Sequence, residues 1–530
     1  MTAQAVSLNW LDQLIASVSP KSGYERLAYK RAIASAGGYE GGRASRLRKP
    51  MRDNRGPDLI VASASQQTRN YARHLERNHD LARGALKVMV RNIVGAKGIS
   101  TEPMPRRADG KLHVEFADQI ARVLKLFERR PEVTGNYNWA MAQRKACGTW
   151  LRDGEMFTQT IAGTVPGLRY RTDLPFVLEL LEPDFVPLDY ENLSQNIVQG
   201  IRCNSWGEKT GFFVYKSHPL QGQQAYTDAI LKEISADRMV HLALCDRLHQ
   251  RRGITLFAAV INSLEDIREI KDYELAASKI ASALTAVITR EKQDGEPPGS
   301  DSQSENGNPL MKLEAGMIFD GAKAGEGIHI VDSKRPNAGL EPFINFNVRG
   351  FAAGIDGSYS SMSRNYNGTY SAQRQELVEV WESYRTMREE MVGQFNCPIY
   401  ERIVSTALAA GILVMPRDLD PYTLFDAQYR GPAMPWIQPV QEAEGELINV
   451  RAGFKSMTQV IRERNGDPWT TIDELAEERR YAAERRVLME SDPATDHERS
   501  ASAEDDPATG QPVPGSARAR HLHLISGNRA

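Results

Sequence analysis

The sequence predicts an α+β fold in which helical segments flank a mostly antiparallel sheet. Several long segments carry apolar residues at helical spacing, and short β-branched or aromatic runs between residues 155 and 244 are separated by Pro, Gly and Asn. At 530 residues the chain is too long for one hydrophobic core, so we expect three or more structural units.

Composition restricts the possible classes of protein. The formal net charge of −2 argues against a surface that binds nucleic acid tightly everywhere, although it allows a restricted contact. No apolar run is long enough to span a membrane, and residues 1–20 lack the pattern of a signal peptide. The cysteines lie far apart and indicate reduced, half-buried thiols. They are Cys147, Cys203, Cys245 and Cys397.

The first half of the chain begins with a basic arm and continues through helices into strands. Short amphipathic helices are expected within residues 7–36, followed by a Gly- and Arg-rich segment. Apolar periodicity then predicts helices over 65–95, 114–129 and 137–153. Strands are expected at 155–162, 176–181, 197–203, 211–215 and within 234–244.

Residues 254–290 contain neither proline nor glycine and carry apolar residues at helical spacing, so they predict one continuous helix. Such a helix would be about 50 Å long and would need neighbours along its whole length. The polar, Gly- and Pro-rich insert 293–309 follows and is expected to be disordered. Strand-like pieces come next, at 317–319 and 328–331.

The stretch from Gly350 to Arg374 begins apolar and becomes a loop of Ser, Tyr, Asn and Gly. A helix is predicted to follow, with Ser371 as N-cap and Glu376 in its first turn, and to end at Pro398. Further helices are expected at 400–410, 440–452, 456–465 and 471–489, before a disordered tail at 491–530.

The motifs of common enzymes are missing from the sequence. It has no Walker A or dinucleotide-binding glycine pattern, no H-E-x-x-H and no G-x-S-x-G. His241, Cys245 and His249 have helical spacing for metal ligands, but their surroundings read as a strand entering a turn. Carboxylate pairs such as Asp418 and Asp420 lie in turn-like sequence. We therefore expect no catalytic residue, no metal and no cofactor.

The aromatic residues of the loop between Tyr359 and Tyr370 allow two interpretations. They could stack on the bases of a nucleic acid, or they could anchor an ordinary surface loop. The residues alone leave both interpretations open.

Two segments carry a resemblance to a known family. Residues 238–253, R-M-V-H-L-A-L-C-D-R-L-H-Q-R-R-G, resemble the lambda-type portal proteins of tailed phages. In that family a strand ending in His leads to a Gln-x-Arg-Gly turn that starts a long helix. The matching positions, which we take as a structural motif, are His241, Gln250, Arg252 and Gly253.

The second segment is A-A-G-I-D-G-S-Y-S-S-M-S-R-N-Y-N-G-T-Y-S-A-Q-R, residues 352–374. It is similar to the family's Ser-Arg-Asn-Tyr block and the Tyr-Ser-x-x-Arg helix start that follows. Weaker matches occur in the family's order at 77–95, 153–157, 180–184 and 200–202, so the resemblance covers roughly residues 8–490.

The resemblance implies a structural protein without catalytic activity, assembled in the host cytoplasm and located at the portal vertex of the virion. It implies a homo-oligomeric ring of twelve subunits that nucleates head assembly and conducts double-stranded DNA. The implied protein partners are the terminase large subunit, the major capsid and scaffolding proteins, and the head–tail connector proteins. No membrane is involved.

The resemblance also implies a portal-protein fold with a wing, long stem helices, a clip insert and a helical crown. The expected units are the arm 1–60, wing 61–253, first stem helix 254–290, clip 291–342, second stem segment and tunnel loop 343–370, long helix and its successor 371–439, crown 440–490 and tail 491–530. The candidates for a DNA-channel loop are Tyr359, Arg364, Asn365, Tyr366, Asn367, Tyr370 and Arg374.

Two other classes of function stay open beside the portal. One is an enzyme acting on DNA, such as a nuclease whose carboxylates the sequence does not bring together. The other is a virion scaffold or adaptor protein that is not a portal.

Overall fold

The computed structural model describes residues 55–219, 231–282 and 339–485, the backbones of strands at 286–290 and 326–330, and the single positions 17, 19, 21 and 487. The chain divides into two compact units, residues 1–60 and 61–530, and nearly all described residues belong to the second. The helices expected within 7–36, the insert 293–309, the piece at 317–319 and the tail 491–530 lie outside the described residues.

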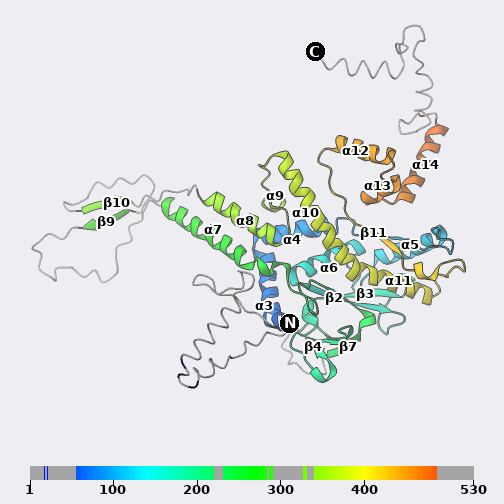
Figure 1. The fold of residues 1–530 in the computed structure, drawn as a ribbon, viewed down its shortest axis with the longest axis horizontal. Helices are drawn as coiled ribbons and strands as arrows, with labels where there is room; N and C mark the ends of the chain where they lie inside the picture. The colour runs from blue at the N-terminus through cyan, green and yellow to red at the C-terminus, as the bar shows by residue number, and fades with distance from the viewer. Residues whose placement is uncertain are drawn as a thin grey trace, which may run out of the picture. The chain divides into compact units, whose positions relative to one another are not determined.

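Within the described residues 55–154 the chain forms four α-helices (Figure 1). The helix expected over 65–95 is two helices, α3 (Pro57–Asn78) and α4 (Asp80–Ile93), because the backbone is extended at His79. The imidazole of His79 is buried and its Nε2 lies 3.0 Å from the carbonyl oxygen of Leu264. The helices predicted over 114–129 and 137–153 are confirmed as α5 (Val114–Arg129) and α6 (Trp139–Asp153). Helix α6 begins two residues later than predicted.

The strands described between residues 155 and 243 form two antiparallel sheets instead of the single sheet that the sequence suggested. The first has the order β3 (Phe176–Leu181), β2 (Glu155–Ala162), β8 (Met239–Ala243). The second runs β4 (Ile197–Val198), β5 (Ile201–Cys203), β6 (Lys209–Tyr215), β7 (Leu231–Ser235). The sheets share a small core, in which the rings of Phe157 and Phe212 lie 5.8 Å apart.

A separate two-stranded ladder, which was not predicted, pairs β1 (Ser100–Pro103) with β11 (Ala427–Arg430). Each strand has four residues, and alternation over so short a run cannot be distinguished from a loop. This pairing brings residues 427–430 next to the segment that connects α4 to α5.

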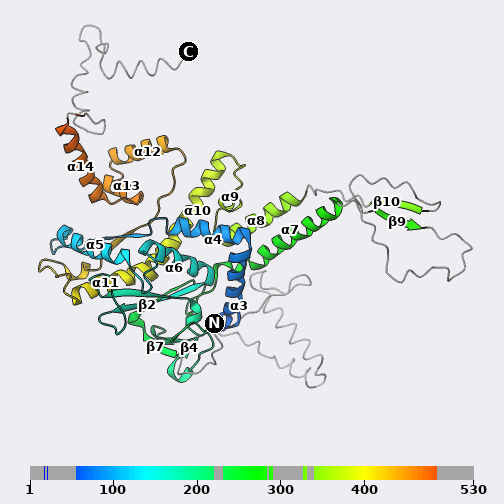
Figure 2. The same ribbon diagram turned by 180° about the vertical axis from the view of Figure 1, so that it is seen from behind.

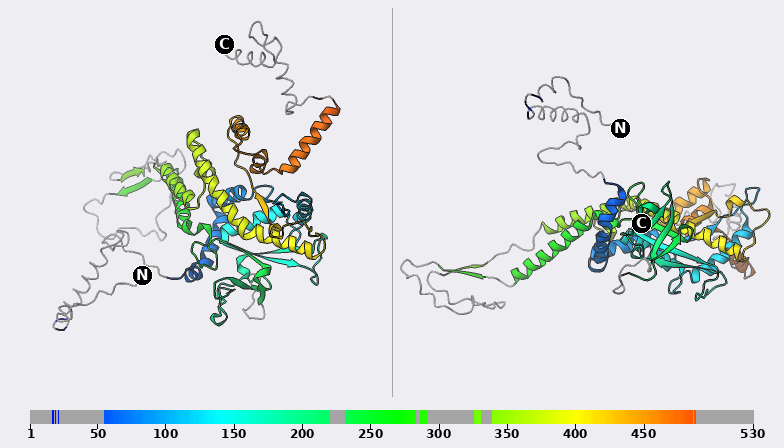
Figure 3. Two further views of the ribbon diagram at one scale, coloured as in Figure 1. Left: turned by 45° about the vertical axis from the view of Figure 1, so that its right-hand side comes forward. Right: turned by 90° about the horizontal axis from the view of Figure 1, so that it is seen from below.

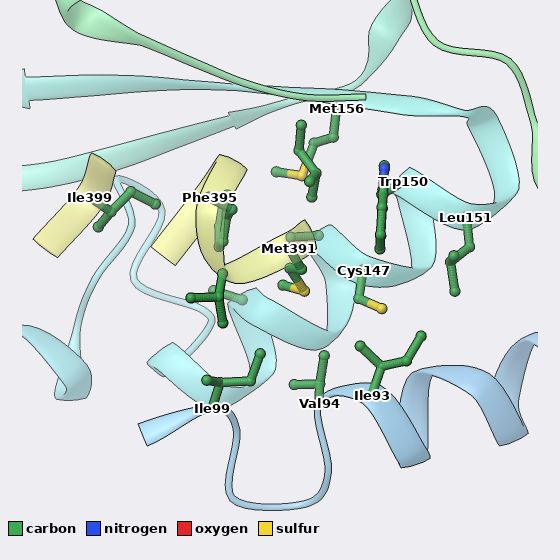
Figure 4. Packing of buried hydrophobic residues seen from close by; sticks show 14 of the residues in the cluster. Ile93, Val94, Ile99, Cys147, Trp150, Leu151, Met156, Met391, Phe395 and Ile399 are labelled. Carbon is green, nitrogen blue, oxygen red and sulfur yellow. The ribbon is translucent and has the colours of Figure 1, made fainter. Parts of the chain in front are cut away.

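The main core lies where α6 packs between α4 and the helices after residue 370 (Figure 4). Cys147 and Trp150 of α6 face this core together with Ile93 and Phe395 (Figure 4). The indole of Trp139 stacks on the ring of Phe395 with centroids 5.6 Å apart. All four cysteines are reduced thiols, but only Cys397 is half-buried, since Cys147 and Cys203 are buried and Cys245 is exposed.

The prediction of one helix over 254–290 is wrong in its extent. A short 3-10 turn (Leu256–Ala259) precedes α7 (Ile261–Ser282), which is therefore about 33 Å long, and 286–290 is strand β9 paired with β10 (Glu326–Ile330). The run Val287, Ile288, Thr289 is β-branched, and such residues favour a strand once a partner strand is present. The strand-like piece predicted at 328–331 corresponds to β10.

Helix α8 (Leu340–Gly354) packs against α7, and the two lie side by side in all views (Figures 1, 2 and 3). Both helices are buried at one end only. Ile261, Leu264 and Ile267 of α7 are buried, as are Val348 and Phe351 of α8. Beyond these turns the described part of the pair exposes large apolar side chains, namely Tyr273, Leu275, Phe343 and Phe346.

The polar loop after α8 is more ordered than the sequence suggested. Residues 359–363 form a short helix, α9 (Tyr359–Ser363), because the hydroxyl of Ser358 accepts a hydrogen bond from the amide of Ser361 and caps its start. Helix α10 (Tyr370–Met391) is capped by Thr369, so the prediction of Ser371 as N-cap is wrong.

Helix α10 does not stop at Pro398 either. It passes through a π-helical turn (Val392–Asn396) into α11 (Cys397–Ala409), and Pro398 lies in the first turn of α11, where proline is tolerated.

The last three described helices confirm the predicted ones to within a few residues. They are α12 (Pro439–Arg451), α13 (Met457–Glu463) and α14 (Pro468–Glu484). Ser456 and Gln459 form a reciprocal capping box at the start of α13. None of the helices in the described residues has the length and apolar character needed to cross a membrane.

Candidate functional site

Arg252, from the predicted motif, lies at the centre of a buried charged cluster. Its guanidinium donates to both carboxylate oxygens of Glu155, the shortest distance being 2.7 Å from Nη2 to Oε1, and both side chains are fully buried. It also donates to the backbone carbonyl oxygens of Val186 and Gln199. We call the group of Glu155, Arg252, Arg69 and His241 the Glu155 cluster.

The other members of the cluster complete the environment of the carboxylate. Arg69 of α3 donates from Nη2 to Oε1 at 2.9 Å, and the amide of Gly253 donates to Oε2 at 3.0 Å. Burial by itself raises the pKa of Glu155, but the charge of Arg252 and the hydrogen bonds from His241 and Arg252 outweigh burial and hold that pKa well below its ordinary value. Glu155 is therefore an anion inside the protein.

His241 lies between this anion and a lysine. Its Nε2 lies 3.1 Å from Oε2 of Glu155, and Nζ of Lys209 lies 2.8 Å from its Nδ1. An ammonium can only donate, so Nδ1 accepts from it and the proton of the imidazole is on Nε2. Burial, together with the charge of Lys209, lowers the pKa of His241 to about 3, and the ring is neutral.

Gly253 is a glycine because two backbone segments touch there. A Cβ on Gly253 would collide with the carbonyl oxygen of Gly154, the residue before Glu155. Gly154 itself has a φ of 88°, in the left-handed region, and ends α6. Since Thr255 then caps the 3-10 turn that leads into α7, the Glu155 cluster fixes the point where α7 begins.

Gln250 shapes the turn between β8 and Arg252. Its Oε1 accepts from the amides of Asp246 and Arg247, and its Nε2 donates to the carbonyl oxygen of Arg252. The structure thus gives all four motif residues contacts at one place. The sequence does not single out Glu155, Arg69 or Lys209, because each lies more than 30 residues away from its partner along the chain.

Glu376 of α10 anchors the start of the predicted DNA-channel loop through hydrogen bonds. Its carboxylate accepts from the hydroxyls of Ser358 and Ser360, at 2.8 and 2.6 Å, and from the amide of Ser360. Although burial raises the pKa of Glu376, these hydrogen bonds lower it further than burial raises it. Sequence analysis assigned Glu376 only to the helix dipole, so this anchoring role is new.

The candidate residues of the loop differ in how firmly they are held. Tyr359 is half-buried and lies under the guanidinium of Arg349, 5.1 Å from the ring centroid. Asn365 accepts from the amide of Asn367 and donates weakly to the hydroxyl of Tyr359, at 3.4 Å. These contacts keep the loop compact around α9.

The exposed candidates are Arg364, Tyr366, Asn367 and Tyr370. The backbone of Arg364 ends α9 in the left-handed region, with φ 58°. Its side chain makes no hydrogen bond or ion pair to any residue that the structure describes. It is therefore available to a ligand outside the chain.

Arg374 is placed differently from the rest of the loop. Its Nη1 donates to Oε1 of Glu442 at 2.8 Å, which joins α10 to α12. Arg374 therefore contributes to the contact between these helices.

A possible metal group is formed by Glu182, Asp184 and His218, whose ligand atoms lie within 4.8 Å of one another. Arg73 donates to Asp184 and lies 3.8 Å from Glu182, and Arg152 also lies 3.8 Å from Glu182. Arg73 and Arg152 also donate to Asp153, so the arrangement is that of an ion-pair network of arginines and carboxylates. His241, Cys245 and His249 occupy a strand and the turn after it, and His241 is bonded to Glu155.

Comparison with known proteins identifies the family of this chain. Residues 43–388, more than half of the chain, match a family model of phage portal proteins. The family is described as phage portal protein, lambda family, and the chain belongs to it. The resemblance seen in residues 238–253 and 352–374 is thereby confirmed.

Three curated relatives have portal names. A probable portal protein of Halomonas phage phiHAP-1 is 21% identical over 430 residues, which cover 79% of this chain and 81% of the relative. Portal protein B of Escherichia phage lambda is 22% identical and covers 68% of this chain and 72% of its own length. The portal protein of Escherichia phage N15 is 20% identical, with coverage of 57% and 61%.

Solved structures give a weaker likeness. A chain of the virion of a native gene transfer agent particle aligns with 13% identity over 78% of this chain and 99% of its own, at a TM-score of 0.42. A chain of the neck of an empty particle of the same kind reaches a TM-score of 0.41. Scores this low do not establish a shared fold.

Proposed function

We propose that this chain assembles into a ring at one vertex of a phage capsid and that double-stranded DNA passes through the ring. The observation that carries the proposal is membership of the lambda family of portal proteins. The resemblance further implies twelve subunits, nucleation of head assembly, docking of the terminase and attachment of the tail connector. The protein would reside in the virion and have no catalytic activity.

The exposed apolar part of the α7–α8 pair supports a ring. Phe346 is 72% exposed and Tyr273 is 71% exposed, although α7 and α8 pack against each other. A helix pair with such side chains is stabilised when another surface covers them. Neighbouring copies in a closed ring supply that surface to every subunit in the same way.

In this proposal the named units keep the roles that the resemblance gives them. Residues 61–253 form the wing, α7 and α8 form the stem, the region between them forms the clip, and α12 to α14 form the crown. The crown helices α12 and α13 bury no residue of their own in the described chain, which favours contacts with other subunits.

The loop 356–370 would face the DNA. Its exposed charges are one arginine, Arg364, and one carboxylate, Asp356. The other exposed side chains are polar or aromatic, namely Tyr366, Asn367, Thr369 and Tyr370, so the loop offers several weak contacts and no net charge. Each neutralised phosphate adds affinity, and a strongly basic tunnel would hold a duplex that has to slide. The near-neutral loop suits a passage.

Negative-stain electron microscopy of the purified full chain tests the proposal. Rings with a central channel are expected. Monomers that cleave DNA in the presence of a divalent metal would overturn it and favour a DNA-acting enzyme.

A further inference from the structure

A groove between α4 and α6 has an unusual excess of positive charge. It encloses about 370 Å³ above the half-buried Val90 and the buried Leu86. Its charged lining consists of five cations and one carboxylate, namely Lys87, Arg91, Arg144, Lys145, Arg152 and Glu76. The whole chain has a net charge of −2, so this concentration is local.

Two of the five cations have structural partners. Arg152 donates to Glu76 at 3.0 Å and to Asp153 at 2.7 Å, so the single carboxylate of the groove is neutralised within the protein. Arg144 donates to the carbonyl oxygens of Gly95 and Ala96, which follow α4.

The remaining three cations are uncompensated. Lys87, Arg91 and Lys145 are exposed, and they make no hydrogen bond or ion pair with any residue that the structure describes. Like charges that lie close together without counter-charges repel one another, and the free energy of this repulsion is recovered when an anion binds.

The spacing of the charges indicates a repeating anion. Lys87 and Arg91 are four residues apart on one face of α4, and Arg83, also exposed, continues the same row one turn earlier. The row spans about 12 Å, with about 6 Å between charges. One DNA strand carries a phosphate every 3.4 Å or so along the axis, so the row can follow three to four consecutive phosphates.

The site is open, and its free cations end in flexible chains at the surface. A small anion would need fixed, buried donors to be held alone, whereas a polyelectrolyte is bound through several mobile cations and the release of its counterions. We propose that the groove between α4 and α6 binds the phosphodiester backbone of double-stranded DNA. This inference adds a second DNA contact to the proposed function and does not depend on the loop 356–370.

The test uses the full chain and a fluorescein-labelled 30-base-pair duplex, with anisotropy measured from 50 to 200 mM NaCl. The variant Lys87→Gln/Arg91→Gln/Lys145→Gln removes the three free charges. Each phosphate contact contributes about 0.9 to the slope of log affinity against log salt, so the slope is expected to become shallower by about 2.7. Wild-type affinity should therefore fall about 40-fold more than that of the variant across this salt range.

The matched control is Arg122→Gln/Lys125→Gln/Arg129→Gln, which removes three exposed cations from α5 and should keep the wild-type slope. The variant Lys87→Arg/Arg91→Lys/Lys145→Arg keeps the three positive charges and should therefore also keep the wild-type salt slope. If the triple Gln variant fails to fold, Lys145→Gln alone replaces it, with an expected change of about 0.9.

Three outcomes overturn the inference: no measurable binding of the duplex by the wild-type chain, an unchanged slope in the Gln variant, or an equal loss in the α5 control. A 20-residue polyglutamate is titrated in parallel. If the triple Gln variant loses binding of polyglutamate but binds the duplex like the wild-type chain, the groove binds an acidic protein segment and the DNA assignment is wrong. Electron microscopy of the same samples separates this result from a failure to form rings.

Discussion

The guanidinium of Arg252 and the carboxylate of Glu155 form a fully buried ion pair, with Nη2 and Oε1 2.7 Å apart, between residues 97 positions apart in the chain. The pair joins the start of β2 to the residue that precedes Gly253 and the helix α7. It is the point at which the sheets and the stem helices of the proposed portal are fixed to each other.

Replacing Glu155 by Gln should destabilise the protein strongly. The variant leaves Arg252 and Arg69 buried without a counter-charge, and breaking a buried pair in this way costs about 3–5 kcal/mol. The free energy of unfolding from urea denaturation, at one fixed protein concentration, measures the effect. Glu179→Gln is the control, because Glu179 on β3 forms a partly exposed pair with Lys232 and should cost about 1 kcal/mol or less. Equal losses in both variants would contradict the role of the cluster.

The buried histidines should make stability depend on pH. Burial lowers the pKa of His241 to about 3, and it also lowers the pKa of His79, whereas an unfolded histidine titrates near 6.5. Below that value the unfolded chain binds protons that the folded chain excludes, so stability falls as pH falls, approaching about 1.4 kcal/mol per pH unit for each histidine.

His241→Gln should therefore make the slope between pH 6 and 5 shallower and leave the contribution of His79. Denaturation midpoints at pH 7, 6 and 5 give both slopes. An unchanged slope in the variant would mean that His241 is protonated in the folded protein.

Gly253→Ala should reduce the yield of folded protein or destabilise it by several kcal/mol, because the new Cβ meets the carbonyl oxygen of Gly154 and neither backbone segment can move without disturbing Glu155. Gly84→Ala is the matched control within α4, where nothing lies within 4 Å of the new Cβ, and should stabilise by about 0.5–1 kcal/mol. Thermal unfolding of the two variants should move in opposite directions. A neutral Gly253→Ala would show that the close approach is not required.

Phe346→Glu should weaken the ring without unfolding the subunit, because the side chain is 72% exposed and only an external surface can cover it. Sedimentation velocity should show a shift toward smaller species at equal concentration. Trp206→Glu is the control, since Trp206 is 91% exposed at the tip of the turn between β5 and β6. Intact rings for Phe346→Glu would exclude this part of α8 from the subunit interface.

Arg364→Ala should leave ring assembly intact and impair DNA packaging or retention. Arg364 is exposed and makes no ion pair among the described residues, and Ala keeps the same left-handed backbone at similar cost. Electron microscopy and the amount of nuclease-resistant DNA per particle measure the two effects. Loss of the ring in this variant would place Arg364 at a subunit interface.

Much of the fold could be predicted because local pattern decides it. The apolar stripe of α5 and the β-branched and aromatic run of β2 are long enough to set both the type and the bounds of the element, and both predictions are confirmed. The prediction of a helix over 254–290 is wrong at its C-terminal end. There Val287, Ile288 and Thr289 form a strand because they pair with β10, a partner that only the tertiary structure supplies. The break at His79 likewise depends on a contact with Leu264, far away in the sequence.

The sequence by itself determined the family, through the Gln-x-Arg-Gly turn and the Ser-Arg-Asn-Tyr block, because short motifs keep their residues and order while the rest of the chain diverges. Only the tertiary structure decided what these residues touch. It placed Glu155 and Arg69 on Arg252, directed Arg374 to Glu442, and brought Lys87, Arg91 and Lys145 into one groove. Ion pairs and charge clusters act through space, over distances of a few ångströms between residues that sequence order leaves far apart.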